Sequence, residues 1–266
     1  MKIKKLAIIQ FPGSNCEKET LAAALYYGFS AEIIRWNTAK ENFNQFDAYI
    51  LPGGFSYQDR IRAGVIASKL PIVSYLKEAA KEEKPILGIC NGCQILAEAG
   101  FFPNLAGNYE IEVAMAPNKK DENTLVGFIC DWVYVKINNP QKNIFTKYFS
   151  EQDILPIQIN HGEGSFKLKE NLQIEPLTTL KYCNEKGEII NDFPINPNGS
   201  MLNLAGISNK AGNILAMMPH PERACFAKQI PTWLNNSWSN KEKSKLTNFH
   251  QEGPWSKIFL SVFDNL

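Results

Sequence analysis

The first hundred residues alternate short apolar runs with stretches of helical spacing. Apolar runs at 6–11, 31–36, 48–51 and 86–89 are typical of buried strands, and the segments between them predict helices. The helix expected after the first strand begins at Ser14, which precedes Glu17 at the spacing of a capping box, and ends at Gly28. Strands that alternate with helices indicate a parallel sheet with helices on both faces.

The second half of the chain has a different pattern, in which helical spacing is weak. Strand-like runs follow one another at 128–137, 154–160, 166–168, 173–183, 203–208 and 213–218. No linker separates this strand-rich region from the first hundred residues. We therefore expect an α/β fold of flavodoxin-like type: a three-layer sandwich with a mixed, largely parallel central sheet and an added strand-rich region, in one domain over residues 1–266.

The last forty residues contain one further change of pattern. Residues 228–253 are rich in Asn, Ser, Lys and Trp, which predicts a surface insertion, and residues 254–266 return to helical spacing with apolar side chains on one face.

Composition and charge narrow the class of protein. The 266 residues are 44% hydrophobic and 21% charged, which is ordinary for a globular protein, and the formal net charge is only +1. This balance gives no reason to expect nucleic acid or an anionic membrane as a partner. No apolar run approaches the ~18 residues of a membrane helix, and the run at 6–9 is too short for a signal peptide. We expect a cytoplasmic protein.

The six cysteines suit such a protein if they are reduced thiols. Cys90 and Cys93 form a CxxC, but no second CxxC or paired histidine motif completes a zinc set, so we expect no metal. On spacing alone, a redox pair remains possible.

The strongest chemical signal is the sequence Gly88-Ile89-Cys90-Asn91-Gly92, between the fourth predicted strand and a helix. It parallels the nucleophile elbow, a strained turn that exposes its central side chain. A cysteine at a helix N-terminus also feels the positive end of the helix dipole, which favours the thiolate. Cys93 is the competing nucleophile, but it lies one turn into the helix and is better read as a core residue.

Two further features follow predicted strands. His220 and Glu222 are two residues apart, so in an extended segment both side chains point to the same side, and the carboxylate can orient the imidazole. Gly53 and Gly54 follow the strand at 48–51, where backbone N–H groups can approach a ligand closely. If these strands are parallel neighbours, Gly54, Cys90 and His220 meet at one sheet edge as an oxyanion site, a nucleophile and a base.

These motifs resemble those of the class I, triad-type glutamine amidotransferases. The matching stretches are GICNGCQ, PGGFSYQD and PHPE. Three more, FPGSNCEKET, HGEGSF and NPNGSMLNLAGI, are similar to those of the glutaminase subunits of phosphoribosylformylglycinamidine synthase, an enzyme of purine biosynthesis. The resemblance covers about residues 1–225. The sequence departs from the family pattern at Gln58, where glycine is usual, and at Cys93, where phenylalanine is usual.

The resemblance implies a glutaminase with a Cys-His-Glu triad. Cys90 would be the nucleophile, His220 and Glu222 would complete the triad, and the backbone N–H groups of Gly54 and Asn91 would form the oxyanion hole. Two rival classes are a free-standing cysteine hydrolase or peptidase of the same fold and a silent regulatory subunit. A silent subunit is expected to have lost part of the triad, and all three residues are present.

The resemblance also implies the ligands and partners. Gln94, His161 and Gly162 would contact the substrate, L-glutamine. Ammonia would pass to a synthetase subunit, joined by a small third subunit, that makes formylglycinamidine ribonucleotide with ATP and Mg. We expect no cofactor in this chain, because it has no Gly-x4-Gly-Lys-[Ser/Thr] loop.

Overall fold

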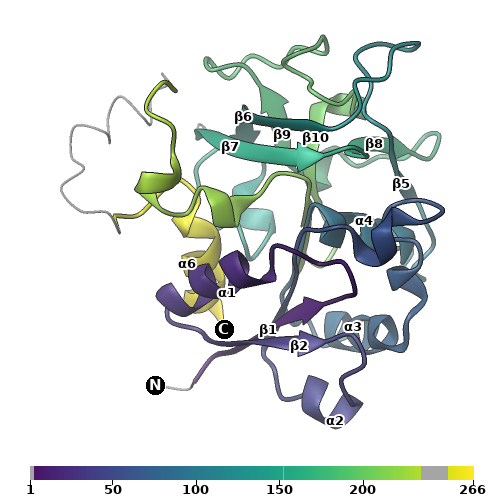
Figure 1. Cartoon of the computed structure of the whole chain (residues 1–266), viewed down its shortest axis with the longest axis vertical. Helices are drawn as coiled ribbons and strands as arrows, with labels where there is room; N and C mark the ends of the chain where they lie inside the picture. The colour runs from purple at the N-terminus through teal and green to yellow at the C-terminus, as the bar shows by residue number, and fades with distance from the viewer. Residues whose placement is uncertain (1–2, 152, 235–250) are drawn as a thin grey trace.

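The computed structural model describes residues 3–151, 153–234 and 251–266. A nine-stranded sheet runs through the molecule in the order β2-β1-β3-β4-β11-β10-β9-β6-β7, and a separate two-stranded sheet pairs β5 with β8 (Figure 1). The strands of the large sheet are β1 (Lys5–Gln10), β2 (Ser30–Arg35), β3 (Ala48–Leu51), β4 (Ile86–Ile89), β6 (Ile129–Ile137), β7 (Ile154–His161), β9 (Thr178–Cys183), β10 (Leu204–Ser208) and β11 (Ile214–Met217).

The five strands from β2 to β11 are parallel, and the four from β10 to β7 pair antiparallel. The expected mixed, largely parallel α/β sheet is thus confirmed. Strands β3, β4 and β11 lie side by side at its centre, and all their residues are buried. Strands that are buried on both faces read as continuous apolar runs, which explains why the sequence pattern finds them.

The α-helices of the described residues are α1 (Glu17–Tyr26), α2 (Lys40–Phe43), α3 (Pro71–Lys81), α4 (Asn91–Glu98) and α6 (Ser256–Asn265). Helices α1 and α6 lie together in Figure 1, away from α3 and α4. The rings of Tyr27 and Phe259 stack with centroids 5.5 Å apart, and the ring of Phe263 lies against Gly28. The helix expected near the C-terminus is therefore present, and it packs on the end of α1.

Three local expectations need correction. Helix α1 starts at Glu17 after Cys16, and the hydroxyl of Ser14 accepts from the N–H of Phe11 instead of capping the helix. The run at 166–168 belongs to β8 (Ser165–Leu168), which pairs with the unpredicted β5 (Val113–Ala116) outside the large sheet. The strand expected from 173 starts only at Thr178, after a 3₁₀ turn that contains Pro176, a residue without an N–H for strand pairing.

Two other expectations concern the ends of the chain. Most of the predicted insertion at 228–253 lies outside the described residues, so it stays a prediction, as does the single domain over 1–266. Within residues 3–151, 153–234 and 251–266, no helix is long and apolar enough to cross a membrane.

Candidate active site

Cys90 occupies a strained turn between β4 and α4. Its φ of 51° and ψ of −106° are unusual for a residue with a side chain. A Cβ added at Gly92 would lie 2.0 Å from the carbonyl oxygen of Leu51, and one at Gly88 would lie 2.9 Å from the carbonyl oxygen of Gly92. Both glycines are thus required by close backbone contacts, and the predicted elbow geometry is confirmed.

The two cysteines of the CxxC have different surroundings. Cys93 is completely buried, and burial raises its pKa well above the usual range, so it remains a neutral thiol. Cys90 keeps 5% exposure, and its Sγ lies 3.5 Å from the carbonyl oxygen of Asn160. Both are free thiols in this structure. The surroundings favour the core role for Cys93 and leave Cys90 as the candidate nucleophile.

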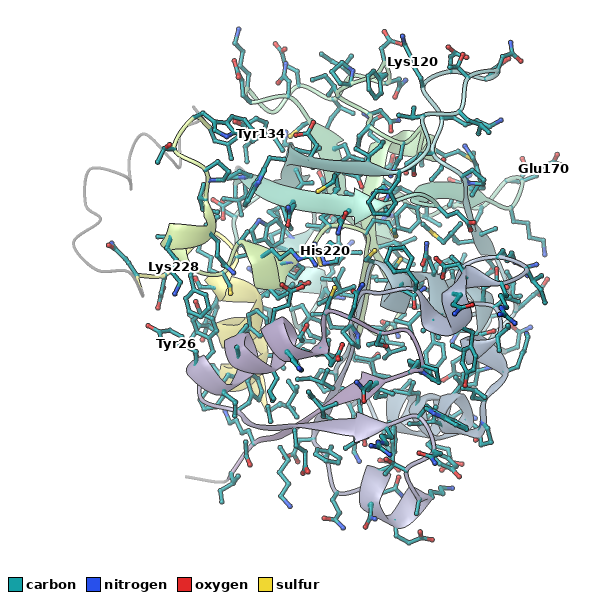
Figure 2. All side chains as sticks on the ribbon, in the orientation of Figure 1. Tyr26, Lys120, Tyr134, Glu170, His220 and Lys228 are labelled. Carbon is teal, nitrogen blue, oxygen red and sulfur yellow. The ribbon has the colours of Figure 1, made fainter. Side chains whose placement is uncertain are left out.

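His220 and Glu222 form a buried pair directly after β11. Their side chains are 1% and 0% exposed, and His220 Nδ1 lies 2.6 Å from Glu222 Oε1. Figure 2 shows His220 in the interior of the molecule. Burial alone lowers the pKa of His220, but the carboxylate of Glu222 and the nearby thiols of Cys16 and Cys90 raise it well above its usual range. The pair can therefore hold a proton next to a nucleophile.

Gly53 shows how closely these groups meet. A Cβ at Gly53 would lie 2.7 Å from Cε1 of His220, 3.0 Å from Sγ of Cys16 and 3.5 Å from Cβ of Cys90. Gly53, Cys90 and His220 follow the carboxyl ends of β3, β4 and β11, as expected for parallel neighbours in one sheet. The predicted meeting of a glycine turn, a cysteine and a histidine is confirmed.

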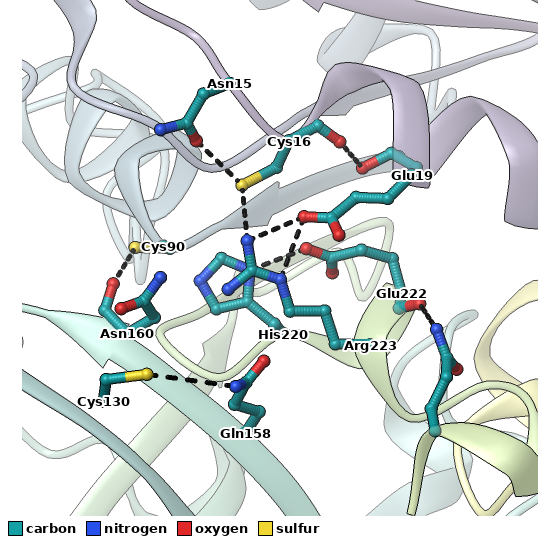
Figure 3. Close-up of polar contacts among 12 residues, drawn as sticks. Asn15, Cys16, Glu19, Cys90, Cys130, Gln158, Asn160, His220, Glu222 and Arg223 are labelled. Carbon is teal, nitrogen blue, oxygen red and sulfur yellow. Dashed lines mark hydrogen bonds and ion pairs between the residues drawn. The ribbon is translucent and has the colours of Figure 1, made fainter.

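Cys16 is the neighbour that sequence reasoning missed. It comes from the turn before α1, and its Sγ accepts a hydrogen bond from Nη2 of Arg223 at 3.3 Å (Figure 3). Arg223 also donates to Oε1 of Glu19 at 2.8 and 2.9 Å. The ligand atoms of Cys16, Glu19, His220 and Glu222 lie within 4.8 Å of one another. The guanidinium beside them disfavours a bound cation, so we read the cluster as a hydrogen-bond network.

The predicted oxyanion groups come from the turn after β3 and from the start of α4. Gly54 has a φ of 145° and pairs with Ser14 of the first turn, where a Cβ would lie 2.7 Å from the backbone N of Asn15. Asn91 is the first residue of α4, so its N–H has no partner within the helix. Its side-chain Oδ1 accepts from the N–H of Ser56 at 3.1 Å, which joins the loop after Gly54 to the elbow.

The loop after Gly54 has an unusual backbone. Tyr57, Gln58, Asp59 and Ile61 all have positive φ, and Gln58 has a φ of 60°. Glycine, usual in the resembling family, would adopt this conformation without strain, so Gln58 keeps the turn at an energetic cost. Burial and the nearby charge of Glu163 raise the pKa of Asp59 to about 6. Charge and backbone strain are therefore concentrated beside the nucleophile.

The three predicted glutamine contacts lie on two elements. Gln94, in α4, donates from Nε2 to the carbonyl oxygen of Glu163 at 2.7 Å, so it joins the helix to the loop after β7. His161 is the last residue of β7 and is 2% exposed. A Cβ at Gly162 would meet only the ring of Phe128, at 3.7 Å. The amide of Gln94 is engaged within the protein, and the three glutamine contacts stay predictions.

Comparisons with known proteins identify the family of this chain. Residues 3–263 match the model of the CobB/CobQ-like glutamine amidotransferase domain. The chain is similar to phosphoribosylformylglycinamidine synthase subunit PurQ of Methanothrix thermoacetophila, with 47% identity over 85% of this chain and 89% of that protein. It is also similar to subunit PurQ of Pyrococcus furiosus, with 40% identity over 83% and 89% of the two chains.

Solved structures show the same fold. The structure of PurLQS from Thermotoga maritima matches with a TM-score of 0.72 and 26% identity, over 99% of both chains. A glutamine amidotransferase from Thermotoga maritima matches with a TM-score of 0.54 at 16% identity, over 100% of this chain and 98% of that one, which supports the fold alone.

Proposed function

This chain belongs to the PurQ family of phosphoribosylformylglycinamidine synthase subunits, with its CobB/CobQ-like glutamine amidotransferase domain, and from this premise we propose that Cys90, His220 and Glu222 are its catalytic triad. The chain is the glutaminase component of that enzyme. The main support for this triad is the buried 2.6 Å contact between His220 Nδ1 and Glu222 Oε1. Cys90, on its strained turn, lies next to this pair.

The proposed reaction begins at Cys90. Its thiolate attacks the side-chain amide carbon of glutamine, and a C–S bond forms. His220 then gives its proton to the amide nitrogen, the C–N bond breaks, and ammonia leaves a thioester on Cys90. His220 next takes a proton from water, whose oxygen attacks the thioester carbon; the C–S bond then breaks, which releases glutamate and returns the thiolate of Cys90. Glu222 keeps the imidazole oriented and stabilises its positive charge throughout.

The negative oxygen of each tetrahedral intermediate needs hydrogen-bond donors. In our proposal, the N–H groups of Gly54 and Asn91 supply them, the first from a loop tied to the first turn of the chain and the second from a helix N-terminus. Gln94, His161 and Gly162 border the substrate. Gln94 contributes by holding the loop that carries Glu163, through its 2.7 Å hydrogen bond.

The ammonia must reach a second active site. Free ammonia in water at neutral pH is mostly protonated, and ammonium is not a nucleophile. We infer that the synthetase subunit docks at the carboxyl edge of the sheet and receives the ammonia through a sheltered path. That subunit uses ATP and Mg for its own reaction, and the complex works in the cytoplasm. A small third subunit completes the complex.

Glutamate release tests this function. The isolated chain should release glutamate slowly, and addition of the synthetase with its substrate and nucleotide should raise the rate markedly. Cys90→Ala should abolish release, whereas Cys93→Ala should retain most of it. Full activity of the isolated chain, unaffected by any added component, would instead support a free-standing hydrolase.

A further inference from the structure

Two buried imidazole nitrogens lack a partner at hydrogen-bond geometry among the described residues. They are Nε2 of His220 and Nε2 of His161. The proposed mechanism uses the first as proton carrier but gives the second no chemical role. A buried polar atom without a partner costs free energy, so its retention points to a ligand that supplies the partner.

The hydrogen bonds of Asn118 determine which nitrogen of His161 carries the proton. Nδ2 of Asn118 donates to the carbonyl oxygens of Gly127 and His161, at 2.8 and 2.7 Å. Its Oδ1 accepts from the N–H of Gly164 at 2.9 Å and faces Nδ1 of His161 at 3.1 Å. Because that oxygen can only accept, Nδ1 of His161 must be the donor.

The imidazole of His161 is also neutral. Burial, followed by the nearby charge of His220, lowers its pKa to about 3. With the proton on Nδ1 and no charge, Nε2 presents a lone pair and is purely an acceptor. His220 is the opposite case, because its pKa is raised and its Nδ1 faces Glu222, so its protonated ring donates from Nε2.

His161 lies next to a residue that contacts the proposed nucleophile. The preceding residue, Asn160, has its carbonyl oxygen 3.5 Å from Sγ of Cys90. His161 is also close enough to His220 for the charge of His220 to lower its pKa. Gly164 leaves room for the ring, since a Cβ there would lie 2.2 Å from Cε1 of His161.

We propose that Nε2 of His161 accepts a hydrogen bond from the carboxamide nitrogen of glutamine and holds the ammonia that this nitrogen becomes. This proposal rests on the proposed glutaminase function. His220 donates the proton that lets the C–N bond break, while His161 binds an N–H of the same nitrogen. Being neutral and proton-free at Nε2, His161 has no proton with which to convert ammonia to ammonium. The pair thereby selects a leaving group that carries N–H.

A substrate pair isolates this contact. L-Glutamate γ-methyl ester forms the same thioester on Cys90, but its leaving oxygen carries no hydrogen for His161 to accept. The complex with the synthetase should hydrolyse both compounds. In His161→Leu, we expect kcat/KM for glutamine to fall about tenfold more than kcat/KM for the ester, as for the loss of one hydrogen bond. His161→Gln, which restores an acceptor oxygen, should recover part of that difference.

Equal losses for the two substrates, or no loss for either, would overturn the proposal. Failure of the wild-type complex to use either compound would instead overturn the proposed function. A spectroscopic measurement removes any dependence on the folding of His161→Leu. In Cys90→Ala labelled with ¹⁵N-histidine, the Nε2 resonance of His161 should show an unprotonated nitrogen and shift on addition of glutamine but not of the ester. A protonated Nε2, or no glutamine-specific shift, would contradict the assignment.

Discussion

Gly53→Ala is a one-carbon change aimed at the geometry of the proposed triad. The added Cβ would lie 2.7 Å from Cε1 of His220, whereas ordinary contacts begin at 3.4 Å. The backbone of Gly53 lies outside the left-handed region, so alanine adds no strain of its own. The cost of the substitution must therefore appear as displacement of the neighbouring side chains.

The size of the displacement sets the expected effect. The imidazole must retreat by about 0.7 Å from the added carbon, to reach the 3.4 Å at which ordinary contact begins. Its other edge is held by the 2.6 Å contact to Glu222, so the ring cannot move without changing its angle to Cys90. Misplacement of a catalytic group by ~1 Å costs on the order of 100-fold in rate, and we expect a comparable fall in kcat.

The assay is steady-state glutamate release by the complex with the synthetase, with thermal unfolding measured on the same protein. Gly107→Ala is the matched control, because its added Cβ meets nothing within 4 Å although its φ is 74°. That variant should lose about 1 kcal/mol of stability and no activity. A folded Gly53→Ala protein with wild-type turnover would refute the placement of His220 as the working base.

Four shorter predictions follow from the same geometry. A glutamine-derived chloroketone should label Cys90 and not Cys93, as peptide mapping would show, and an adduct on Cys93 alone would reverse the assignment. Cys90→Ala should reduce glutamine hydrolysis by ~10⁴-fold or more, if the triad acts as a unit. Glu222→Gln should lower kcat strongly with a modest change in KM, since the charge acts mainly in the transition state; unchanged kcat in the folded variant would mean that another acid orients the histidine. Asp59 has its pKa raised to about 6 in the folded protein, above the 3.8 of the free group, so its contribution to stability is lost as pH rises through about 6. Asp59→Asn should therefore gain stability relative to wild type between pH 5 and 7.5, by about 1 kcal/mol in urea unfolding, and a pH-independent difference would contradict this origin.

Several features of the site could be predicted from the sequence because they are local. The elbow is a strand, a turn and a helix in consecutive residues, and its glycines are required by contacts within that turn and with the adjacent strand. The contact between His220 and Glu222 spans two residues in an extended segment. The meeting of Cys90 with Gly53 needed one non-local assumption, that β3, β4 and β11 are parallel neighbours, and the buried apolar runs already favoured it.

Other features depended on contacts between segments far apart in the chain, which no local pattern encodes. Cys16 and Arg223 are 207 positions apart, and only the packing of α1 against the segment after β11 brings them together beside His220. Asn118 reaches His161 across 43 positions and thereby determines which ring nitrogen is free. The sequence by itself thus determined which residues are the candidates for catalysis. The tertiary structure alone decided their protonation and hydrogen-bonding partners, because burial and electrostatic interactions depend on neighbours in space and not on position along the chain.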